Sequence, residues 1–167
     1  EWTNSIGMTF RLIQPGTFTM GEGKADSHRV TLTEPFHLGI YAVTQEQYGR
    51  VMGTNPSHFK GKPDSPQRPV EEVSWEDGVK FANALSKKMG LRPAYEGTDN
   101  NARLVEGANG FRLPFEVEWE WAAKGGEDYD YAGSNNPDEV AWYGDWGGGG
   151  TARGETRPVG KLKINGY

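Results

Sequence analysis

Residues 69–77 read PVEEVSWED, and this stretch ends one element and begins another. Its first part, Val70–Val73, predicts a short strand, after which Ser74 is a suitable helix N-cap with Asp77 at the third helical position. Beyond the cap, apolar residues recur every three or four positions, at Trp75, Val79, Ala82, Leu85 and Met89. This spacing predicts a helix with one face toward a core, which ends at Gly90.

Upstream of that stretch, short apolar segments alternate with turn residues, which is typical of antiparallel strands. These segments are residues 8–13, 17–20, 29–32 and 36–41. Thr44 and Gln47 then form a capping-box pair, so a helix of two or three turns is expected before Gly53. The four prolines between residues 55 and 69 predict a defined surface loop, because proline lacks a backbone donor.

Downstream, the polar residues 95–110 predict a hairpin or an excursion, and Phe115–Lys124 predicts a further helix that ends at Gly125. Its inward side chains are expected to be Val117, Trp121 and Ala122. The carboxylates of Glu116, Glu118 and Glu120 are expected on solvated faces, since alternate residues of a helix cannot converge on one substrate atom. From Glu127 onward, long loops pinned by aromatic side chains are expected.

The composition limits the classes of function. The chain has 167 residues, enough for one domain, and shows no internal repeat. Its net charge of −5 disfavours nucleic acid and anionic membrane surfaces as partners, and no apolar run is long enough to cross a bilayer. It has no cysteine, and the scattered histidines His28, His37 and His58 lack the spacing of a zinc site, so no metal site is expected.

Four segments together resemble the sulfatase-modifying-factor family, which includes the formylglycine-generating enzymes. They are residues 4–8 with 15–21 (NSIGM, PGTFTMG), residues 43–48 with 55–59 (VTQEQY, NPSHF), residues 69–77 (PVEEVSWED) and residues 112–122 (RLPFEVEWEWA). The resemblance covers almost the whole chain. Residues 95–110 and the segments GSNN at 133–136 and VAWY at 140–143 are similar to a bacterial subgroup that includes ligand-binding variable proteins diversified by retroelements.

The resemblance implies an α+β fold, a variant of the C-type-lectin-like fold with two main helices, small antiparallel sheets and much irregular structure. It also implies that residues 1–167 are one domain that lacks the family's carboxy-terminal segment, where the enzymes carry paired cysteines and a calcium site. Calcium or copper is therefore expected only through such a segment, and none in this chain. We expect a second segment or a partner chain to complete the fold.

Two departures from the family pattern affect this chain. The family has Thr where Phe115 stands, and the lost cap hydroxyl costs about 1 kcal/mol unless the ring packs on an apolar surface. Where the enzymes begin another calcium site with Asn, this chain has Ala141-Trp142-Tyr143, which offers a hard cation little beyond the Tyr143 hydroxyl. We do not expect that calcium site here.

The candidate ligand-binding residues lie in one aromatic and polar cluster near the end of the sequence. They are Trp142, Tyr143, Asp145, Trp146 and Arg153, and no catalytic residue is proposed. Ring faces beside hydrogen-bonding groups can bind a peptide or a sugar, although aromatic anchors beneath loops are the commoner case. The neighbouring glycines 147–150 lack the sequence of a phosphate loop.

Three functions remain open at this stage. The first is a non-catalytic binding module for a protein, peptide or glycan, which the absence of a thiolate favours. The second is part of an oxidase that converts a sulfatase cysteine to formylglycine, with its cysteines beyond this chain. The third is a structural subunit of a surface assembly. An extracytoplasmic or cell-surface location is expected.

Overall fold

The structure is a computed structural model that describes residues 1–21, 25–98, 101–144 and 154–167. Within these residues the helices are α1 (Gln45–Met52), α2 (Trp75–Lys88), α3 (Glu116–Lys124) and α4 (Pro137–Val140), with a 3-10 turn, η1, at Ser65–Gln67. The strands are β1 (Trp2–Thr3), β2 (Thr9–Ile13), β3 (Gly16–Met20), β4 (His28–Leu32), β5 (Phe36–Gly39), β6 (Tyr95–Glu96) and β7 (Arg103–Leu104). The predicted α+β class is confirmed.

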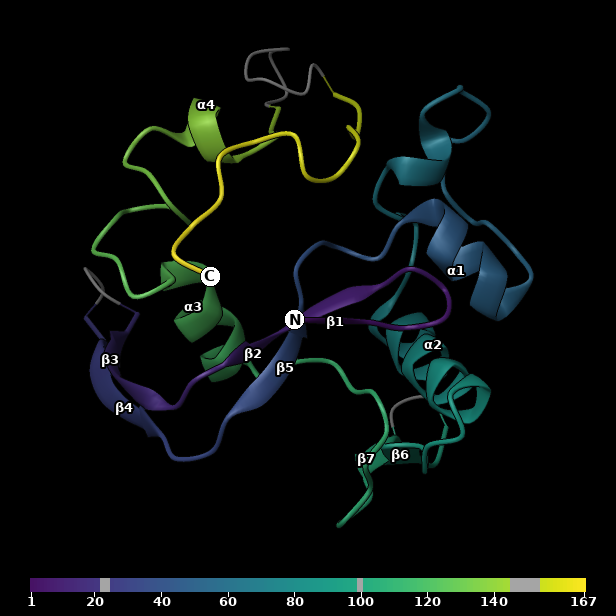
Figure 1. Cartoon of the computed structure of the whole chain (residues 1–167), viewed down its shortest axis with the longest axis horizontal. Helices are drawn as coiled ribbons and strands as arrows, with labels where there is room; N and C mark the ends of the chain where they lie inside the picture. Colours follow the sequence, from purple (N-terminus) through teal and green to yellow (C-terminus); the bar gives the residue numbers. More distant parts are fainter. Residues whose placement is uncertain (22–24, 99–100, 145–153) are drawn as a thin grey trace.

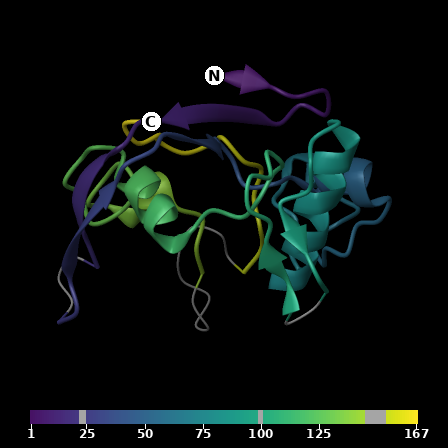
Figure 2. The ribbon, with the colours of Figure 1, turned by 90° about the horizontal axis from the view of Figure 1, so that it is seen from below.

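The strands form three small antiparallel sheets, ordered β1-β2-β5, β3-β4 and β6-β7. The strands β1, β2 and β5 lie between two groups of elements (Figure 1). We call α1, α2, β6 and β7 the helical lobe, and β3, β4, α3 and α4 the α3 lobe. The last residues, 157–167, cross from one lobe to the other (Figure 1, yellow; Figure 2), and we call them the strap.

The first two helices begin at the capping boxes that the sequence predicts. In α1, Thr44 Oγ1 accepts a hydrogen bond from the Gln47 backbone N–H at 3.3 Å, and Gln47 Oε1 accepts one from Thr44 N–H at 3.0 Å. In α2, Ser74 Oγ and the Asp77 carboxylate exchange the same pair of bonds at 3.1 and 3.0 Å. Each box satisfies backbone donors that a helix start would otherwise leave unpaired.

The main apolar core lies between the start of the chain and the helices α1 and α2. Its buried members are Ile6, Met8, Phe10, Tyr48, Phe81 and Leu85. The rings of Tyr48 in α1 and Phe81 in α2 stack with their centroids 5.4 Å apart. This core joins the start of the chain to both helices, so the first ten residues are fixed by side-chain burial rather than by long strands.

The predicted apolar face of α2 is correct in its centre and wrong at its start. Val79, Ala82 and Leu85 are buried, but Trp75 is 54% exposed and meets the Tyr95 ring edge-on at 6.4 Å. Phe81, which the predicted face left out, is buried against α1. Because α2 is covered on two sides, its buried face is wider than one stripe.

The predicted strand at Val70–Val73 does not form. Val70 N–H donates to Val43 O at 2.9 Å, and the nearest pairing is an isolated bridge between Thr44 and Pro69. Glu71 then turns its carboxylate to the backbone N–H groups of His58 and Phe59, at 2.9 and 2.8 Å, and Glu72 has a φ of +59°. A left-handed residue ends the extended chain, so pairing stops there.

The expectation that Glu118 is solvated is wrong. Glu118 is buried, and its two carboxylate oxygens accept from both Arg112 guanidinium nitrogens at 2.6 Å. Glu118 also accepts from the Phe115 N–H at 2.8 Å, which is the half of a capping box that does not need a hydroxyl at the N-cap. Burial raises the pKa of the Glu118 carboxyl, but the bonds from Arg112 and Phe115 outweigh it and hold the pKa below its usual value.

Phe115 makes a cation–π contact at the start of α3. It is 50% exposed, and the centroid of its ring lies 4.5 Å from the Arg112 guanidinium carbon. The predicted hairpin over residues 95–110 does form. Its strands pair Tyr95 with Leu104, and the Asn83 side chain on α2 exchanges two hydrogen bonds with the Tyr95 backbone at 2.8 and 3.0 Å.

The α3 lobe is held around Trp121. Its indole N–H donates to Gln14 O at 2.9 Å, and its ring lies 5.4 Å from the Phe18 ring. Gly16 is required here, because a Cβ at that position would come within 2.6 Å of the Trp121 ring. Of the three side chains predicted to face inward, Ala122 is buried, whereas Val117 and Trp121 are half-buried.

Candidate functional site

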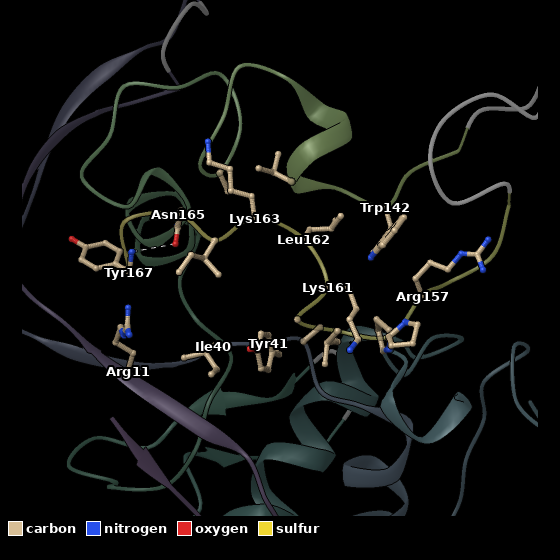
Figure 3. A pocket seen from close by; sticks show the side chains of 18 of the residues that line it. Arg11, Ile40, Tyr41, Trp142, Arg157, Lys161, Leu162, Lys163, Asn165 and Tyr167 are labelled. Atoms are coloured by element: carbon tan, nitrogen blue, oxygen red, sulfur yellow. Dashed lines mark hydrogen bonds between the residues drawn. The ribbon is translucent and has the colours of Figure 1, made fainter. Parts of the chain in front are cut away.

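A groove of about 580 Å³ runs between the strap, the segment after β5 and the chain around α4. Figure 3 shows the side chains that line it, and most of them come from the strap. Its apolar and aromatic lining includes Ile40, Tyr41, Val140, Trp142, Leu162 and Ile164. Its charged lining consists of Glu1, Arg11, Arg157, Lys161 and Lys163. An apolar body with charged groups at its rim is the usual form of a binding site.

One side of the groove depends on the contact between Tyr41 and Gly160. Gly160 has a φ of +69°, and a Cβ at that position would lie 2.9 Å from the Tyr41 ring. A side chain there would displace the ring, so the close approach requires glycine. The Tyr41 side chain is nevertheless 50% exposed, which leaves part of the ring open to the groove.

Polar contacts fasten the strap at three places. Val159 N–H donates to Gln67 O at 3.0 Å beside η1, and Lys163 N–H donates to Glu139 O at 3.0 Å in α4. The Asn165 amide donates to Ala122 O at 2.7 Å and to Ala123 O at 2.9 Å in the last turn of α3. The strap is therefore held mainly through backbone and amide groups, and its apolar side chains are free to line the groove.

An ion cluster fixes the start of the strap to the Pro-rich loop. Arg68, only 3% exposed, bonds both oxygens of Asp64 at 3.0 Å, Glu155 at 3.1 Å and Thr156 O at 2.7 Å. Glu155 also pairs with Lys62, and with Arg157 at 3.2 Å. The Lys62 ammonium, and then the Arg68 guanidinium, lower the pKa of Glu155 from 4.5 to about 2.

The structure brings only part of the predicted cluster to the groove. Trp142 lines it and is 40% exposed. Tyr143 donates its hydroxyl to Asp138 Oδ1 at 2.6 Å and does not line the groove. Asp145, Trp146 and Arg153 lie outside the described residues. The predicted binding role of these five side chains stays a prediction.

Sequence reasoning missed the residues that make most of the groove. Tyr41 was placed in a strand, and Lys161, Leu162, Lys163 and Ile164 received no role. A signal was available in the strap, where basic and apolar residues alternate over positions 161–164. Ile164 is 72% exposed, but a single exposed apolar side chain is common on protein surfaces, so the pattern alone did not indicate a site.

The residues described do not fit the metals that the family resemblance implies elsewhere. Copper in those enzymes is bound by thiolates, and this chain has no cysteine. Near Tyr143, the Asp138 carboxylate accepts from the tyrosine hydroxyl, and Glu139 bonds Ser134 Oγ at 2.9 Å. In the described part of the chain, no three His, Cys, Asp or Glu side chains gather into a cluster suited to a metal ion.

Solved structures share this architecture. Treponema denticola variable protein 1 superposes with a TM-score of 0.84 and 33% identity, over 100% of this chain and 70% of that one. A crystal structure of CarF gives a TM-score of 0.76 and 28% identity, over 96% of this chain and 75% of that one. PvdO from Pseudomonas aeruginosa, at 23% identity and a TM-score of 0.61, shares the fold. The fold is therefore that of formylglycine-generating enzymes.

The sequence comparison agrees with the fold. Residues 6–167 match the sulfatase-modifying factor enzyme 1-like domain, and this chain belongs to that family. Chaperone protein LppX of Paenibacillus barcinonensis is 41% identical over 184 residues, which cover 92% of this chain. The chain spans 64% of that relative's length. None of the described helices is both long and apolar enough to cross a membrane.

Proposed function

We propose that this chain is a non-catalytic module that binds polypeptide in the groove along the strap. The observation that carries the proposal is the groove's lining, in which exposed aromatic and aliphatic side chains stand beside charged ones. Tyr41 and Trp142 offer ring faces that lose little conformational entropy on binding. The similarity to a protein named as a chaperone supports polypeptide as the ligand, because chaperones bind other chains.

The absence of a thiol supports a binding role over the family's oxidation chemistry. Formylglycine formation needs cysteine thiolates in the enzyme, and the 167 residues contain none. The second candidate, part of an oxidase that acts on a sulfatase cysteine, is favoured by the enzyme-like domain family itself. In that case the thiolates would come from outside these residues. Aerobic incubation of the protein isolated from its native host with a sulfatase-derived cysteine peptide, followed by mass spectrometry for the aldehyde, separates the two functions: an aldehyde supports the oxidase, and an unchanged cysteine supports the binding module.

The proposal includes a polypeptide that covers the groove. The exposed side chains of Ile164 and Tyr41 leave apolar surface open, and burying such surface stabilises a complex by about 25 cal/mol per Å². A second segment, from the same chain or from a partner, would complete the fold by packing there. An extracytoplasmic or cell-surface location belongs to the same proposal, and fractionation of the native host cells tests it.

The binding function is tested with a peptide array and two matched tryptophan variants. An array of unrelated unfolded sequences is probed with the wild-type chain, with Trp142→Ala and with Trp75→Ala. Both tryptophans are exposed, but Trp75 lies on α2, away from the groove. We expect Trp142→Ala to lose most array signal, with Trp75→Ala unchanged. Equal signals from all three proteins, or no signal from any, would reject the groove as a polypeptide site.

A further inference from the structure

The rim of the groove has a charge opposite to that of the whole chain. The chain carries 18 basic and 23 acidic side chains, for a net charge of −5. Of the five charged residues that line the groove, four are basic: Arg11, Arg157, Lys161 and Lys163. A local field of this sign inside an acidic molecule selects for negative groups on whatever enters.

The pairing of these cations leaves positive charge available. Arg11 pairs with Glu1, the acidic residue of the lining. Arg157 shares Glu155 with Lys62 and Arg68, so one carboxylate faces three cations. Arg68 also pairs with Asp64. Lys163 pairs with Glu139 at 3.7 Å and lies 5.7 Å from the centroid of the Tyr129 ring, so its charge is partly compensated. Among the described residues, Lys161 is exposed and has no acidic partner.

The strap's own pattern indicates the conformation of the ligand. Lys161, Leu162, Lys163 and Ile164 alternate basic and apolar side chains, and all four line the groove. An extended peptide also alternates its side chains, with about 3.3 Å between residues. Figure 3 shows Lys161 and Lys163 extending to opposite sides of the strap, so a peptide with acidic residues at every second position would present a carboxylate to Lys161. Its intervening residues would face the leucine, the isoleucine and the rings of Tyr41 and Trp142.

We propose that the groove binds an extended segment of a partner protein in which acidic residues alternate with aromatic or aliphatic ones. This inference rests on the proposed polypeptide-binding function and adds the class of partner. The lysines set the preference for acidic residues, and the apolar lining supplies the contact area. Salt should weaken the preference, because exposed charges are screened over about 10 Å at 0.1 M and about 3 Å at 1 M ionic strength.

The test uses three labelled synthetic peptides that share one apolar framework of Leu, Phe and Tyr. The alternate positions are Glu in the first, Gln in the second and Lys in the third, and binding is measured by fluorescence anisotropy. We expect the Glu peptide to bind about tenfold more tightly than the Gln peptide at low salt, and the Lys peptide to bind least. Near 1 M salt the affinities for the Glu and Gln peptides should converge.

Two charge reversals locate the site. Lys161→Glu should reduce affinity for the Glu peptide about tenfold and leave the Gln peptide unaffected. Lys80→Glu is the control, because Lys80 is an exposed lysine on α2 outside the groove. Both positions are exposed, so both variants should fold, and the circular dichroism spectra check this. A Lys161→Glu variant that binds the Glu peptide as wild type does would overturn the proposal.

The remaining outcomes separate this inference from the function on which it rests. If the Gln and Glu peptides bind equally and Trp142→Ala weakens both, the groove binds polypeptide but the acidic preference is wrong. If no peptide binds here or on the array, the binding function fails as well. A concentration-dependent dimer that excludes the peptide would assign the groove to a second copy. A longer native protein that rejects the peptide while residues 1–167 bind it would assign the groove to its own chain.

Discussion

The helical lobe and the α3 lobe are held together by different kinds of contact. In the helical lobe, Tyr48, Phe81 and Leu85 form one buried apolar cluster with the start of the chain. The α3 lobe has a smaller apolar contact between Phe18 and Trp121, and hydrogen bonds such as those of Trp121 and Asn165 and ion pairs around Glu155 join it and the strap to other segments. The helical lobe is therefore the stable scaffold, and the open groove lies along the strap beside the α3 lobe.

This division has a physical reason. Apolar burial is non-directional and gives a packed interior in which a lost methyl group is felt. Hydrogen bonds and exposed ion pairs contribute less net stability, because water competes for the same groups. A segment held by polar groups can therefore keep its apolar side chains for a ligand, as the strap does with Ile164.

The largest expected effect breaks the core of the helical lobe. Leu85→Ala removes a side chain that is 1% exposed, and we expect it to lower the free energy of unfolding by about 2–5 kcal/mol. Chemical denaturation measures the loss. Ile164→Ala, at a side chain that is 72% exposed, should change stability by no more than about 0.5 kcal/mol. Similar losses for the two variants would contradict the comparison of the lobes.

The second effect concerns the buried ion pair at the start of α3. Glu118→Gln leaves the Arg112 guanidinium without its charged partner, and we expect a loss of about 2 kcal/mol in the free energy of unfolding. Glu116→Gln, at an exposed glutamate in the same turn, is the matched control. If both substitutions lower the free energy of unfolding by the same amount, the Arg112–Glu118 pair contributes no more to stability than an exposed negative charge in the first turn of α3.

A smaller effect tests the fastening of the strap to α3. Asn165→Ala removes the two amide hydrogen bonds to Ala122 O and Ala123 O, and we expect a cost of about 1 kcal/mol. Hydrogen exchange should accelerate in the strap, including the Tyr167 and Val159 amides, with α1 and α2 unaffected. Lys161→Ala, in the same segment, serves as control. Faster exchange throughout α2 would show that the two lobes open together.

The smallest effect is a pH dependence at the ion cluster. The folded pKa of Glu155 is about 2, below its ordinary 4.5, so its ion pairs contribute fully above about pH 4.5. Their contribution is lost as the pH falls from there toward 2. Site-resolved NMR of Thr156 and Arg68 should show this step, and Glu155→Gln should remove it. A change in the Thr156 and Arg68 signals between pH 7 and pH 5 would contradict the lowered pKa of Glu155.

How far the sequence predicts this structure depends on whether the deciding contact is local. The starts of α1 and α2 were predicted because a capping box involves residues three apart, and the structure confirms both. The strand at Val70–Val73 was wrong, because Glu71 finds partners at His58 and Phe59, which no local pattern reveals. Glu118 was also placed in solvent wrongly, although its partners are near in sequence: Phe115 is three residues away and Arg112 is six residues away.

The candidate site shows the same limit more strongly. Trp142 was predicted as a binding residue and lines the groove, but Tyr41 and the strap residues were not. They lie more than a hundred positions apart in the sequence and meet only because Gly160 lets the strap pass against the Tyr41 ring. The alternation of basic and apolar residues at 161–164 is visible in the sequence, but the sequence does not show which other residues face it, so it does not define a site.

By itself, the sequence determined the family, the α+β class, the capped helices and the lack of a thiol. The family and the α+β class follow from the resemblance that four segments carry, whereas the capped helices follow from short spacings that act through the local backbone. The tertiary structure alone decided that the strap crosses between the lobes and that basic side chains gather around an apolar groove in an acidic chain. Those outcomes depend on contacts between distant segments, whose energies exist only once the chain has folded.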